Sequence, residues 1–132
     1  ADKRILSGIL MLLMFFMACK KQEGKGGKHS VTGKVIARKY NTSTQTYTSP
    51  AYPSQEEDVY IIYGDDVSYG DHQNANFDGS FEFKYLHKGK YKVYAYSKDS
   101  TNASPSGKIA VVKEFVIGHE KTTTVPDILI LK

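Results

Sequence analysis

The sequence predicts an all-β protein, a seven-stranded antiparallel β-sandwich that follows an N-terminal signal peptide. Short segments after residue 29 alternate apolar and polar residues, which is the period of strands that bury one face. Residues that favour turns, mainly Gly, Asp and Asn, separate these segments. About a hundred residues in seven short strands are typical of a sandwich and suffice for one buried core. We expect no helix after residue 18.

The first 18 residues are predicted to be a lipoprotein signal peptide. Two basic residues precede an apolar run, 5–18, that is too short to span a bilayer as a helix. Cys19, the only cysteine, follows at once, and Phe16-Met17-Ala18-Cys19 resembles a lipobox. Acyl chains on Cys19 are therefore expected to anchor the protein at the outer membrane, on its periplasmic or its outer side. The alternative is an unprocessed signal anchor with an incidental cysteine.

Residues 19–29 are expected to form a flexible tether, because they are rich in Lys and Gly and have no apolar residue after Cys19. The signal peptide and the tether carry the whole formal net charge of +4, since residues 30–132 contain 12 basic and 12 acidic side chains. A domain without excess positive charge argues against nucleic acid as a partner.

The first half of the domain, 30–132, is predicted to hold three strands. The first covers 30–39, with a bulge expected at Gly33, and residues 31, 33, 35 and 37 share its apolar face. The second, 58–63, is apolar on both faces, as is typical of a central strand. A turn at 64–66 leads to a short third strand, 67–69. The segment 40–57 is a long loop, and loops of this length are often functional.

The best-specified stretch, 76–96, predicts a β-hairpin. Phe81, Phe83 and Tyr85 alternate with polar residues, and Tyr91, Val93 and Ala95 alternate with Lys92, Tyr94 and Tyr96. Asp78-Gly79 supplies a turn before the first of these strands, and Gly89 supplies one between them.

Two more strands are expected, over 108–117 and 120–131. In the first, Ile109 and Val111 share a face with Phe115 and Ile117 only if Lys113 points inward, so a bulge is expected near Lys113. In the second, Pro126 is expected at an edge or a bulge.

The hairpin resembles the signature of carboxypeptidase-regulatory-like domains. The resemblance rests on Asp78-Gly79-Ser80-Phe81-Glu82-Phe83, then Leu86, then Gly89-Lys90-Tyr91-Lys92-Val93. Lys88 stands where the family usually has Pro. These domains belong with the transthyretin-like and Cna-B-like domains, which are seven-stranded Greek-key sandwiches of prealbumin or immunoglobulin type. The resemblance implies this fold, a Tyr91 that plugs the core with a corner-type hydrogen bond, and an accessory role.

Antiparallel strands place their connections alternately at the two ends of a sandwich. The long loops 40–57, 70–79 and 97–107 are then expected at one end. The tight turns 64–66, 87–89 and 118–119, together with the tether, are expected at the other. A recognition surface is accordingly expected on the long loops, at the end away from the membrane.

No constellation of catalytic side chains is visible, so we expect no enzyme, no metal ion and no cofactor. The four histidines are scattered, and the chain ends in Leu129-Ile130-Leu131-Lys132, whereas hydroxyisourate hydrolases of the transthyretin fold end in Tyr-Arg-Gly-Ser. The run Asn74-x-Asn76-x-Asp78-Gly79 resembles half of a calcium loop, but Tyr85 stands where the bidentate Glu belongs. Calcium binding at this turn is left open.

Tyrosines are the candidate partner-binding residues. Exposed aromatic rings stack on sugars or anchor protein partners, although they also pack the ends of sandwiches. The expected function is that of a non-catalytic outer-membrane lipoprotein, an accessory module for an outer-membrane protein complex; the alternative is a module that binds carbohydrate or peptide. The candidate residues are Tyr40, Tyr47, Tyr52, Tyr94 and Tyr96.

Overall fold

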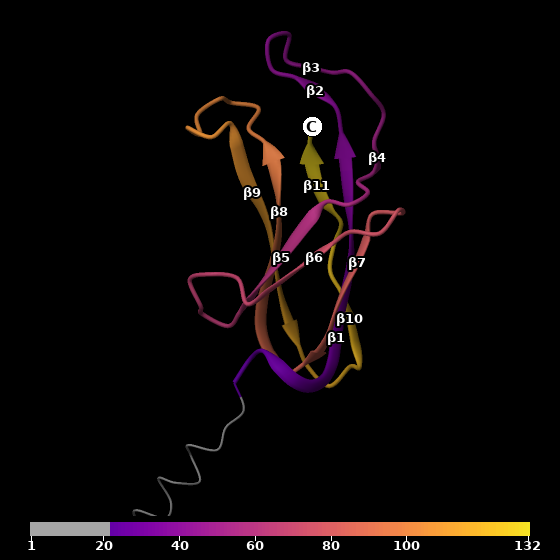
Figure 1. The fold of residues 1–132 in the computed structure, drawn as a ribbon, viewed down its shortest axis with the longest axis vertical. Helices are drawn as coiled ribbons and strands as arrows, with labels where there is room; N and C mark the ends of the chain where they lie inside the picture. Colours follow the sequence, from indigo (N-terminus) through magenta and orange to yellow (C-terminus); the bar gives the residue numbers. More distant parts are fainter. Residues whose placement is uncertain (1–21) are drawn as a thin grey trace, which may run out of the picture.

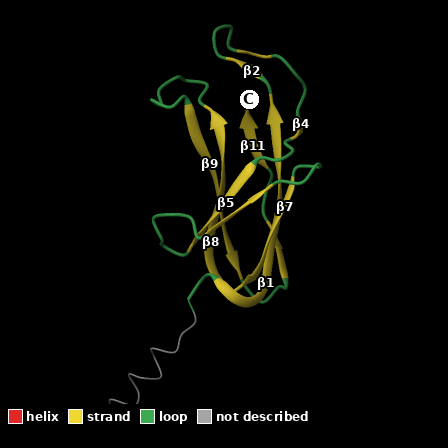
Figure 2. Ribbon diagram, viewed as in Figure 1, coloured by secondary structure: helices red, strands yellow, loops and turns green. Residues whose placement is uncertain are grey.

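The computed structural model describes residues 22–132, and all regular structure in this range is β (Figure 1; Figure 2). No helix among these residues could cross a membrane. The predicted signal peptide and Cys19 lie outside the described range. The eleven strands are β1 (Lys25–Arg38), β2 (Tyr40–Asn41), β3 (Thr46–Tyr47), β4 (Tyr52–Pro53), β5 (Asp58–Tyr63), β6 (Asp71–Asn74), β7 (Ser80–Leu86), β8 (Gly89–Lys98), β9 (Lys108–Ile117), β10 (Thr122–Thr124) and β11 (Ile128–Leu131).

The first sheet is built around β1, which has two short neighbours on each side. The first half of β1 pairs with β7 in antiparallel and with β10 in parallel orientation. Its second half pairs with β4 in antiparallel and with β11 in parallel orientation. The predicted last strand is therefore two strands, broken around Pro126, which has no N–H to donate. The expectation of a fully antiparallel sandwich was wrong, because both C-terminal strands run parallel to β1.

The second sheet has the order β6-β5-β8-β9, and every pair in it is antiparallel. β5 and β9 have the predicted bounds. The β8–β9 register runs without a shift from Gly89↔Ile117 to Lys98↔Lys108, so the bulge expected near Lys113 does not exist. Lys113 instead shares the inward face with Val111, Phe115 and Ile117, which is tolerated because β9 is an edge strand.

The two sheets face each other across one apolar core. Tyr91 closes the end of the core where the described chain starts. The Tyr91 hydroxyl donates to the His87 carbonyl at 2.6 Å and accepts from the Gly24 N–H at 2.9 Å. The corner-type hydrogen bond expected of Tyr91 is confirmed. The core residues of the sheet strands are Val31, Val35, Ala37, Phe81, Phe83, Leu86, Ile128 and Ile130 from the first sheet, and Val59, Ile61, Tyr91, Val93, Ala95 and Ile117 from the second.

The predicted β-hairpin over 76–96 is not a hairpin. Both strands exist, but β7 pairs with β1, whereas β8 pairs with β5 and β9, so the link at 87–88 crosses from one sheet to the other. Tyr85 marks the end of the regular alternation. Its φ of 61° turns its side chain outward, where it is 69% exposed, and Leu86 enters the core in its place.

Three further expectations need correction. β1 begins at Lys25, so residues 25–29 of the predicted tether lie in a strand, and Gly24 before them is buried. Residues 67–69 form no strand and Val67 is fully exposed; the third strand is β6, a few residues later. Gly33 lies in regular register, and its lack of a side chain makes room for Phe81 and Val125.

The two ends of the sandwich differ (Figure 1). The β2–β3 tip, the loop 99–107 and the C-terminus lie at one end, and the described chain starts at the other. The connection 75–79 was expected at the same end as the other long loops. It lies instead beside β1, where the Gly79 carbonyl accepts a hydrogen bond from the Val35 N–H. We call the end where the described chain starts the base, and the opposite end the tip.

Candidate tyrosine site

An aromatic cluster covers the outer face of the second sheet. Val59 and Ile61 are buried, so the strand period directs Tyr60 of β5 outward. The same alternation in β8 buries Val93 and Ala95 and directs Tyr94 and Tyr96 outward. We call the set Tyr60, Tyr69, His72, Tyr94 and Tyr96 the tyrosine face.

Tyr60 is the centre of the tyrosine face, because its ring contacts all four other rings. Tyr94 lies nearly parallel to it, with ring centroids 5.0 Å apart and an interplanar angle of 16°. Tyr69 lies 4.9 Å away, and His72 and Tyr96 both lie at 5.9 Å. Tyr94 and Tyr96 also meet edge to face at 5.7 Å. These distances are typical of favourable aromatic pairs, so the rings support one another.

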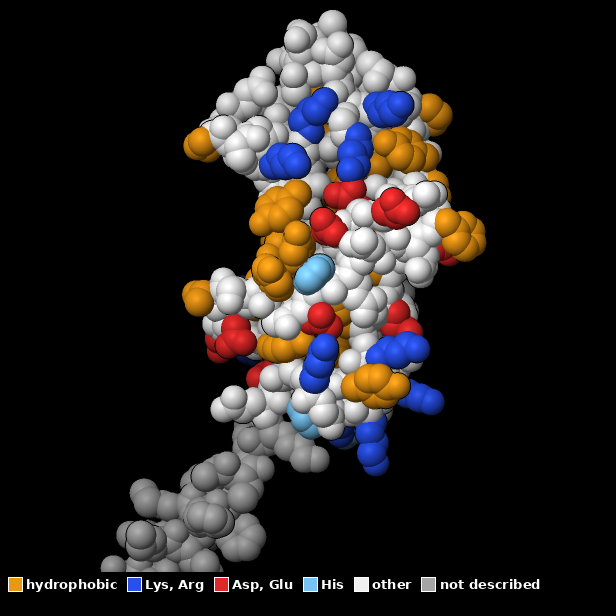
Figure 3. Space-filling view, in the orientation of Figure 1, with side chains coloured by type: hydrophobic (Ala, Val, Ile, Leu, Met, Phe, Trp, Pro, Cys, Tyr) orange, Lys and Arg blue, Asp and Glu red, His pale blue; other side chains and the backbone are white. Residues whose placement is uncertain are grey.

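The strand register extends this cluster across the whole sheet. His72 pairs with Tyr60, Tyr60 with Tyr94, and Tyr94 with Val112, so one side chain from each strand stands in a row. Strands lie about 4.8 Å apart, which makes the row about 14 Å wide. Figure 3 shows hydrophobic side chains gathered at mid-height on the left of the face it displays.

Much of the ring surface is open to solvent. Tyr69 is 48% and Tyr96 is 45% exposed, Tyr60 and Tyr94 are half-buried, and His72 is exposed. The rings thus pack against the sheet on one side and offer edges and faces on the other. A flat ligand could cover them without any rearrangement of the backbone.

Polar side chains flank the aromatic row on both sides. Asp58 and Asn74 are paired across β5 and β6 on the tip side, and both are exposed. On the base side, Lys92 and Glu114 are cross-strand partners with their charged atoms 3.7 Å apart. The face therefore combines an apolar centre with donors and acceptors at its margins.

The hydroxyls of Tyr60 and Tyr94 stay neutral at ordinary pH. Burial raises the pKa of Tyr60, and the nearby Asp58 carboxylate adds to the rise. Burial also raises the pKa of Tyr94, with a further contribution from Tyr96. Neutral hydroxyls both donate and accept hydrogen bonds, which suits a ligand rich in hydroxyl groups.

Only two of the five predicted tyrosines belong to the tyrosine face. Tyr94 and Tyr96 lie on the tyrosine face. Tyr40 and Tyr47 face each other across the β2–β3 pair at the tip, 5.4 Å apart, and the Arg38 guanidinium lies 3.9 Å above the Tyr47 ring. Tyr52 is half-buried and packs against the core.

Tyr60, Tyr69 and His72 were missed as site residues. Alternation within the predicted strand 58–63 already placed Tyr60 opposite the apolar Val59 and Ile61, and this was the available signal. The register that sets Tyr60 beside Tyr94, and the loop that carries Tyr69, depend on tertiary packing.

The candidate calcium turn uses its acidic group internally. The Asp78 carboxylate accepts hydrogen bonds from the Ser80 N–H at 3.0 Å and the Ser80 hydroxyl at 2.6 Å. The hydroxyl bond above all lowers the pKa of Asp78. Within residues 22–132, no group of three or more His, Cys, Asp or Glu side chains is arranged to hold a metal ion.

The comparisons with known proteins are sparse. No protein-family model matches the chain, and no curated protein matches it either. Among solved structures, the chain is similar to the crystal structure of a putative carbohydrate binding protein from Pseudomonas aeruginosa. The identity is 12%, the match covers 88% of this chain and 94% of that one, and the TM-score is 0.46. A likeness this distant carries no argument about function.

Proposed function

We propose that this protein is a lipid-anchored binding module of the cell envelope that holds a carbohydrate chain on its tyrosine face. The observation that carries the proposal is the solvent-open cluster around Tyr60. Sugar rings present flat C–H faces that pack on aromatic rings, and their hydroxyls bond polar groups at the edge.

The dimensions and charge of the tyrosine face fit such a ligand. A row about 14 Å wide offers room for several sugar rings. Asp58, Asn74, Lys92 and Glu114 stand where hydroxyls of a bound sugar would reach. Neutral Tyr60 and Tyr94 place no net charge at the centre, so an uncharged glycan meets no electrostatic penalty there.

The tip supports a second candidate function, that of a protein-interaction module. Tyr47 is exposed and lies under Arg38, and Tyr and Arg are the residues most often found at the centres of protein interfaces. An outer-membrane protein complex is the partner proposed for this surface. The tyrosine face is favoured because it joins five rings, whereas the tip joins two.

The lipid anchor on Cys19 and a relationship with carboxypeptidase-regulatory-like domains are further parts of this proposal. Acyl chains on Cys19 would hold the protein at the outer membrane, on its periplasmic or outer side, with the base toward the bilayer. The motif from Asp78 to Val93 supports a relationship with carboxypeptidase-regulatory-like domains. No enzymatic role is proposed.

A panel of soluble polysaccharides, tested by affinity electrophoresis, examines the carbohydrate function. The variants are Tyr94→Ala and Tyr96→Ala, and the matched control is Tyr47→Ala at the tip. Loss of a central ring should weaken binding by about tenfold or more, because buried aromatic anchors dominate such contacts. Tyr47→Ala should bind as the unchanged protein does.

Two outcomes would contradict the carbohydrate function. Binding that falls only in Tyr47→Ala would move the site to the tip. Absence of binding to every glycan, together with a membrane protein that co-purifies in a Tyr47-dependent way, would favour the interaction module.

A further inference from the structure

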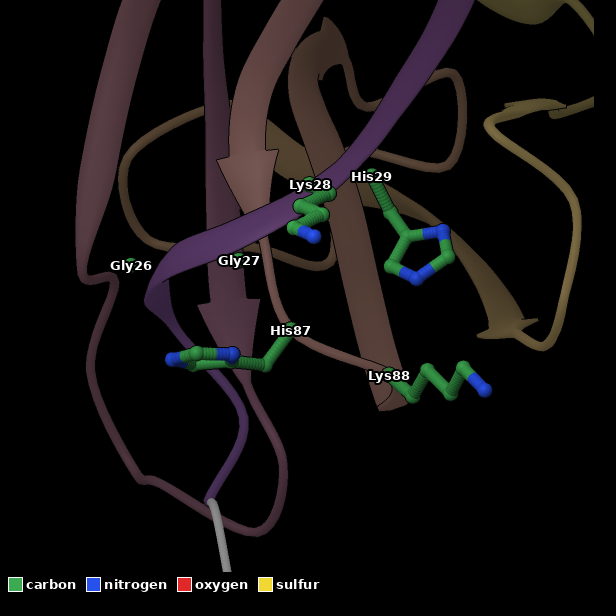
Figure 4. A pocket seen from close by; sticks show the side chains of 6 residues that line it. All are labelled: Gly26, Gly27, Lys28, His29, His87 and Lys88. Atoms are coloured by element: carbon green, nitrogen blue, oxygen red, sulfur yellow. The ribbon is translucent and has the colours of Figure 1, made fainter.

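A second surface lies at the base, away from the tyrosine face. It is a hollow of about 270 Å³ between the start of β1 and the link from β7 to β8 (Figure 4). We call it the base pocket; its lining residues are Gly26, Gly27, Lys28, His29, His87 and Lys88.

The base pocket is lined by potential cations and by no carboxylate. Two of its six residues are Lys, two are His and two are Gly. Figure 4 shows the amino group of Lys28 and the ring of His29 pointing toward the link that carries His87 and Lys88. In the same view, the His87 ring and the Lys88 side chain extend away from each other, to the left and to the right. Lysines and imidazoles around one hollow whose lining holds no carboxylate favour an anionic ligand.

Hydrogen bonds fix two of these side chains. His29 Nδ1 lies 2.6 Å from the Glu120 carbonyl, which only accepts, so Nδ1 carries the proton and donates it. The other ring nitrogen, Nε2, points down toward the pocket (Figure 4). Lys88 Nζ lies 2.9 Å from His119 Nδ1, and an ammonium only donates, so two of its N–H groups remain to bind a ligand.

The glycines make the shape of the base pocket possible. A Cβ at Gly26 would lie 2.9 Å from His87 Nε2, and the residue has a φ of 115° that side chains disfavour. A Cβ at Gly27 would lie 2.0 Å from the Leu86 carbonyl oxygen. The His87 N–H donates to the Gly24 carbonyl, which ties the link to the start of the chain. The pocket is thus preformed, and only glycine fits at positions 26 and 27 of β1.

The position of the base pocket indicates what approaches it. The described chain starts beside it, and the preceding residues add Lys20, Lys21 and the apolar run that ends before Cys19. Lys90 and Lys121 are also exposed near this end, and Glu23, Asp65 and Glu120 are acids close to them. Lys and Arg side chains gather near the lower end of the molecule in Figure 3, and a second group lies near its upper end. A membrane reached through the N-terminus would meet this cationic end first.

We propose that the base pocket binds the phosphate of an anionic lipid headgroup and so docks the base of the domain on the membrane. This inference rests on the proposed anchor only for the orientation of the domain. Phosphate offers several acceptor oxygens, and the ammonium groups of Lys28 and Lys88 can donate to them, while His29 and His87 line the same hollow. Docking would hold the sandwich upright, with the tyrosine face open to the side.

Vesicle binding by the full chain tests the docking, with Cys19→Ser present throughout so that no acyl chain contributes. The protein should bind phosphatidylglycerol–phosphatidylcholine vesicles more tightly than pure phosphatidylcholine vesicles. Lys28→Gln/Lys88→Gln should weaken the binding to anionic vesicles about 25-fold, at about fivefold per lysine near the surface. The control Lys39→Gln/Lys108→Gln removes the same charge at the tip end and should change little. Equal losses in both variants, or no preference for anionic vesicles, would overturn the proposal.

Titration with inorganic phosphate distinguishes binding in the base pocket from general electrostatic attraction to a membrane surface. The imidazole NMR signals of His29 and His87 should shift, and those of His72 on the tyrosine face should not. Absence of shifts would overturn the pocket as a phosphate site. Shifts without vesicle binding would make the ligand a soluble phosphate compound and overturn the docking. Tyr94→Ala should change neither the vesicle binding nor the histidine shifts. A failure of the carbohydrate function can therefore be told apart from a failure of the docking.

Discussion

Tyr91 joins the start of the described chain to the link between β7 and β8 through one hydroxyl group. Its ring is buried in the core, and its oxygen bridges the Gly24 N–H and the His87 carbonyl. The hydroxyl thereby gives both the Gly24 N–H and the His87 carbonyl a hydrogen-bond partner. The sequence predicted the burial and the corner-type bond, but not that the bond would secure the first described residues.

Tyr91→Phe should lower the free energy of unfolding by about 1–3 kcal/mol, because it leaves the Gly24 N–H without its partner in a buried place. Urea denaturation of the full chain gives this value. Amide exchange at Gly24 should accelerate in the same variant. Tyr85→Phe, at an exposed tyrosine of β7, should change neither; an equally small effect of both substitutions would contradict the role of the Tyr91 hydroxyl.

The sequence places Gly33 within the first predicted strand, but it does not reveal why glycine is needed there. The bulge expected there is absent. A Cβ at Gly33 would instead lie 2.6 Å from Phe81 Cζ and 2.7 Å from Val125 Cγ2. The contact with Val125 joins residues 92 positions apart, which no local pattern reveals.

Gly33→Ala should therefore destabilise the domain by about 1–3 kcal/mol, the usual effect of overpacking a core. Gly118→Ala is the matched control, since a Cβ at Gly118 meets no atom within 4 Å. Thermal unfolding of the two variants should separate them clearly. Equal melting temperatures would mean that the Phe81 ring and Val125 can move aside without strain.

At the scale of elements, the uninterrupted strands could be predicted and their partners could not. β5 and β9 have the expected bounds because their alternation or apolar content ends at clear turn residues. The β7 and β8 patterns also predicted strands correctly, but alternation says which face is buried and not which strand lies alongside. Tyr94 and Tyr96 could be predicted to face outward for the same reason, while their meeting with Tyr60 required the β5–β8 register.

The edge strand β9 carries its own protection against self-association. Ten residues of β9 pair with β8 on one side, and its other side has no strand in the described part of the chain. Val112 and Val116 are exposed on its outer face. Lys113, directed inward between Val111 and Phe115, is a charge that a second strand could not cover without desolvating it.

Lys113→Ile should remove this protection and promote association of two copies through β9. Sedimentation velocity at increasing protein concentration should show dimers or larger species that the unchanged protein lacks. Lys108→Ile, at the exposed start of the same strand, is the control for added apolar surface. Similar association of both variants would assign the effect to hydrophobicity rather than to the inward charge.

The loop 99–107 is ordered by one carboxylate. Asp99 is buried, and its two oxygens accept bonds from the Thr101 hydroxyl, the Thr101 N–H and the Ser104 N–H. These bonds, that of the Thr101 hydroxyl above all, lower the pKa of Asp99. The order they give is complete above the ordinary aspartate pKa of about 4 and is lost as the pH falls through the lower pKa of the folded protein.

Acid should consequently loosen this loop before the sheets unfold. The amide NMR signals of Thr101 and Ser104 should move toward unstructured positions as the pH falls below about 4. Amides of the β8–β9 ladder serve as the reference. Simultaneous loss of loop and ladder signals would show that Asp99 acts on global stability alone.

At the scale of the whole molecule, buried tyrosines make the stability of the fold fall at alkaline pH. Burial is the main cause that raises the pKa of Tyr60, Tyr63, Tyr91 and Tyr94. A raised pKa in the folded state means that this stabilisation is complete below the ordinary tyrosine pKa of about 10 and is lost as the pH rises beyond it.

The free energy of unfolding should fall steadily above pH about 10, and tyrosinate absorbance should develop at higher pH in the folded protein than in urea. Tyr85→Phe should leave the stability curve in place, since that ring is exposed. A flat stability curve through this range would contradict the role of burial.

The parallel pairing of β1 with β10 and β11 sets how the protein responds to mechanical load. The described chain enters β1 at the base, and β11 ends at the tip beside the C-terminus. Tension between the two ends would pull these strands past each other along their length. Their inter-strand hydrogen bonds would then share the load together instead of opening one at a time, so we expect the sandwich to resist extension along this axis.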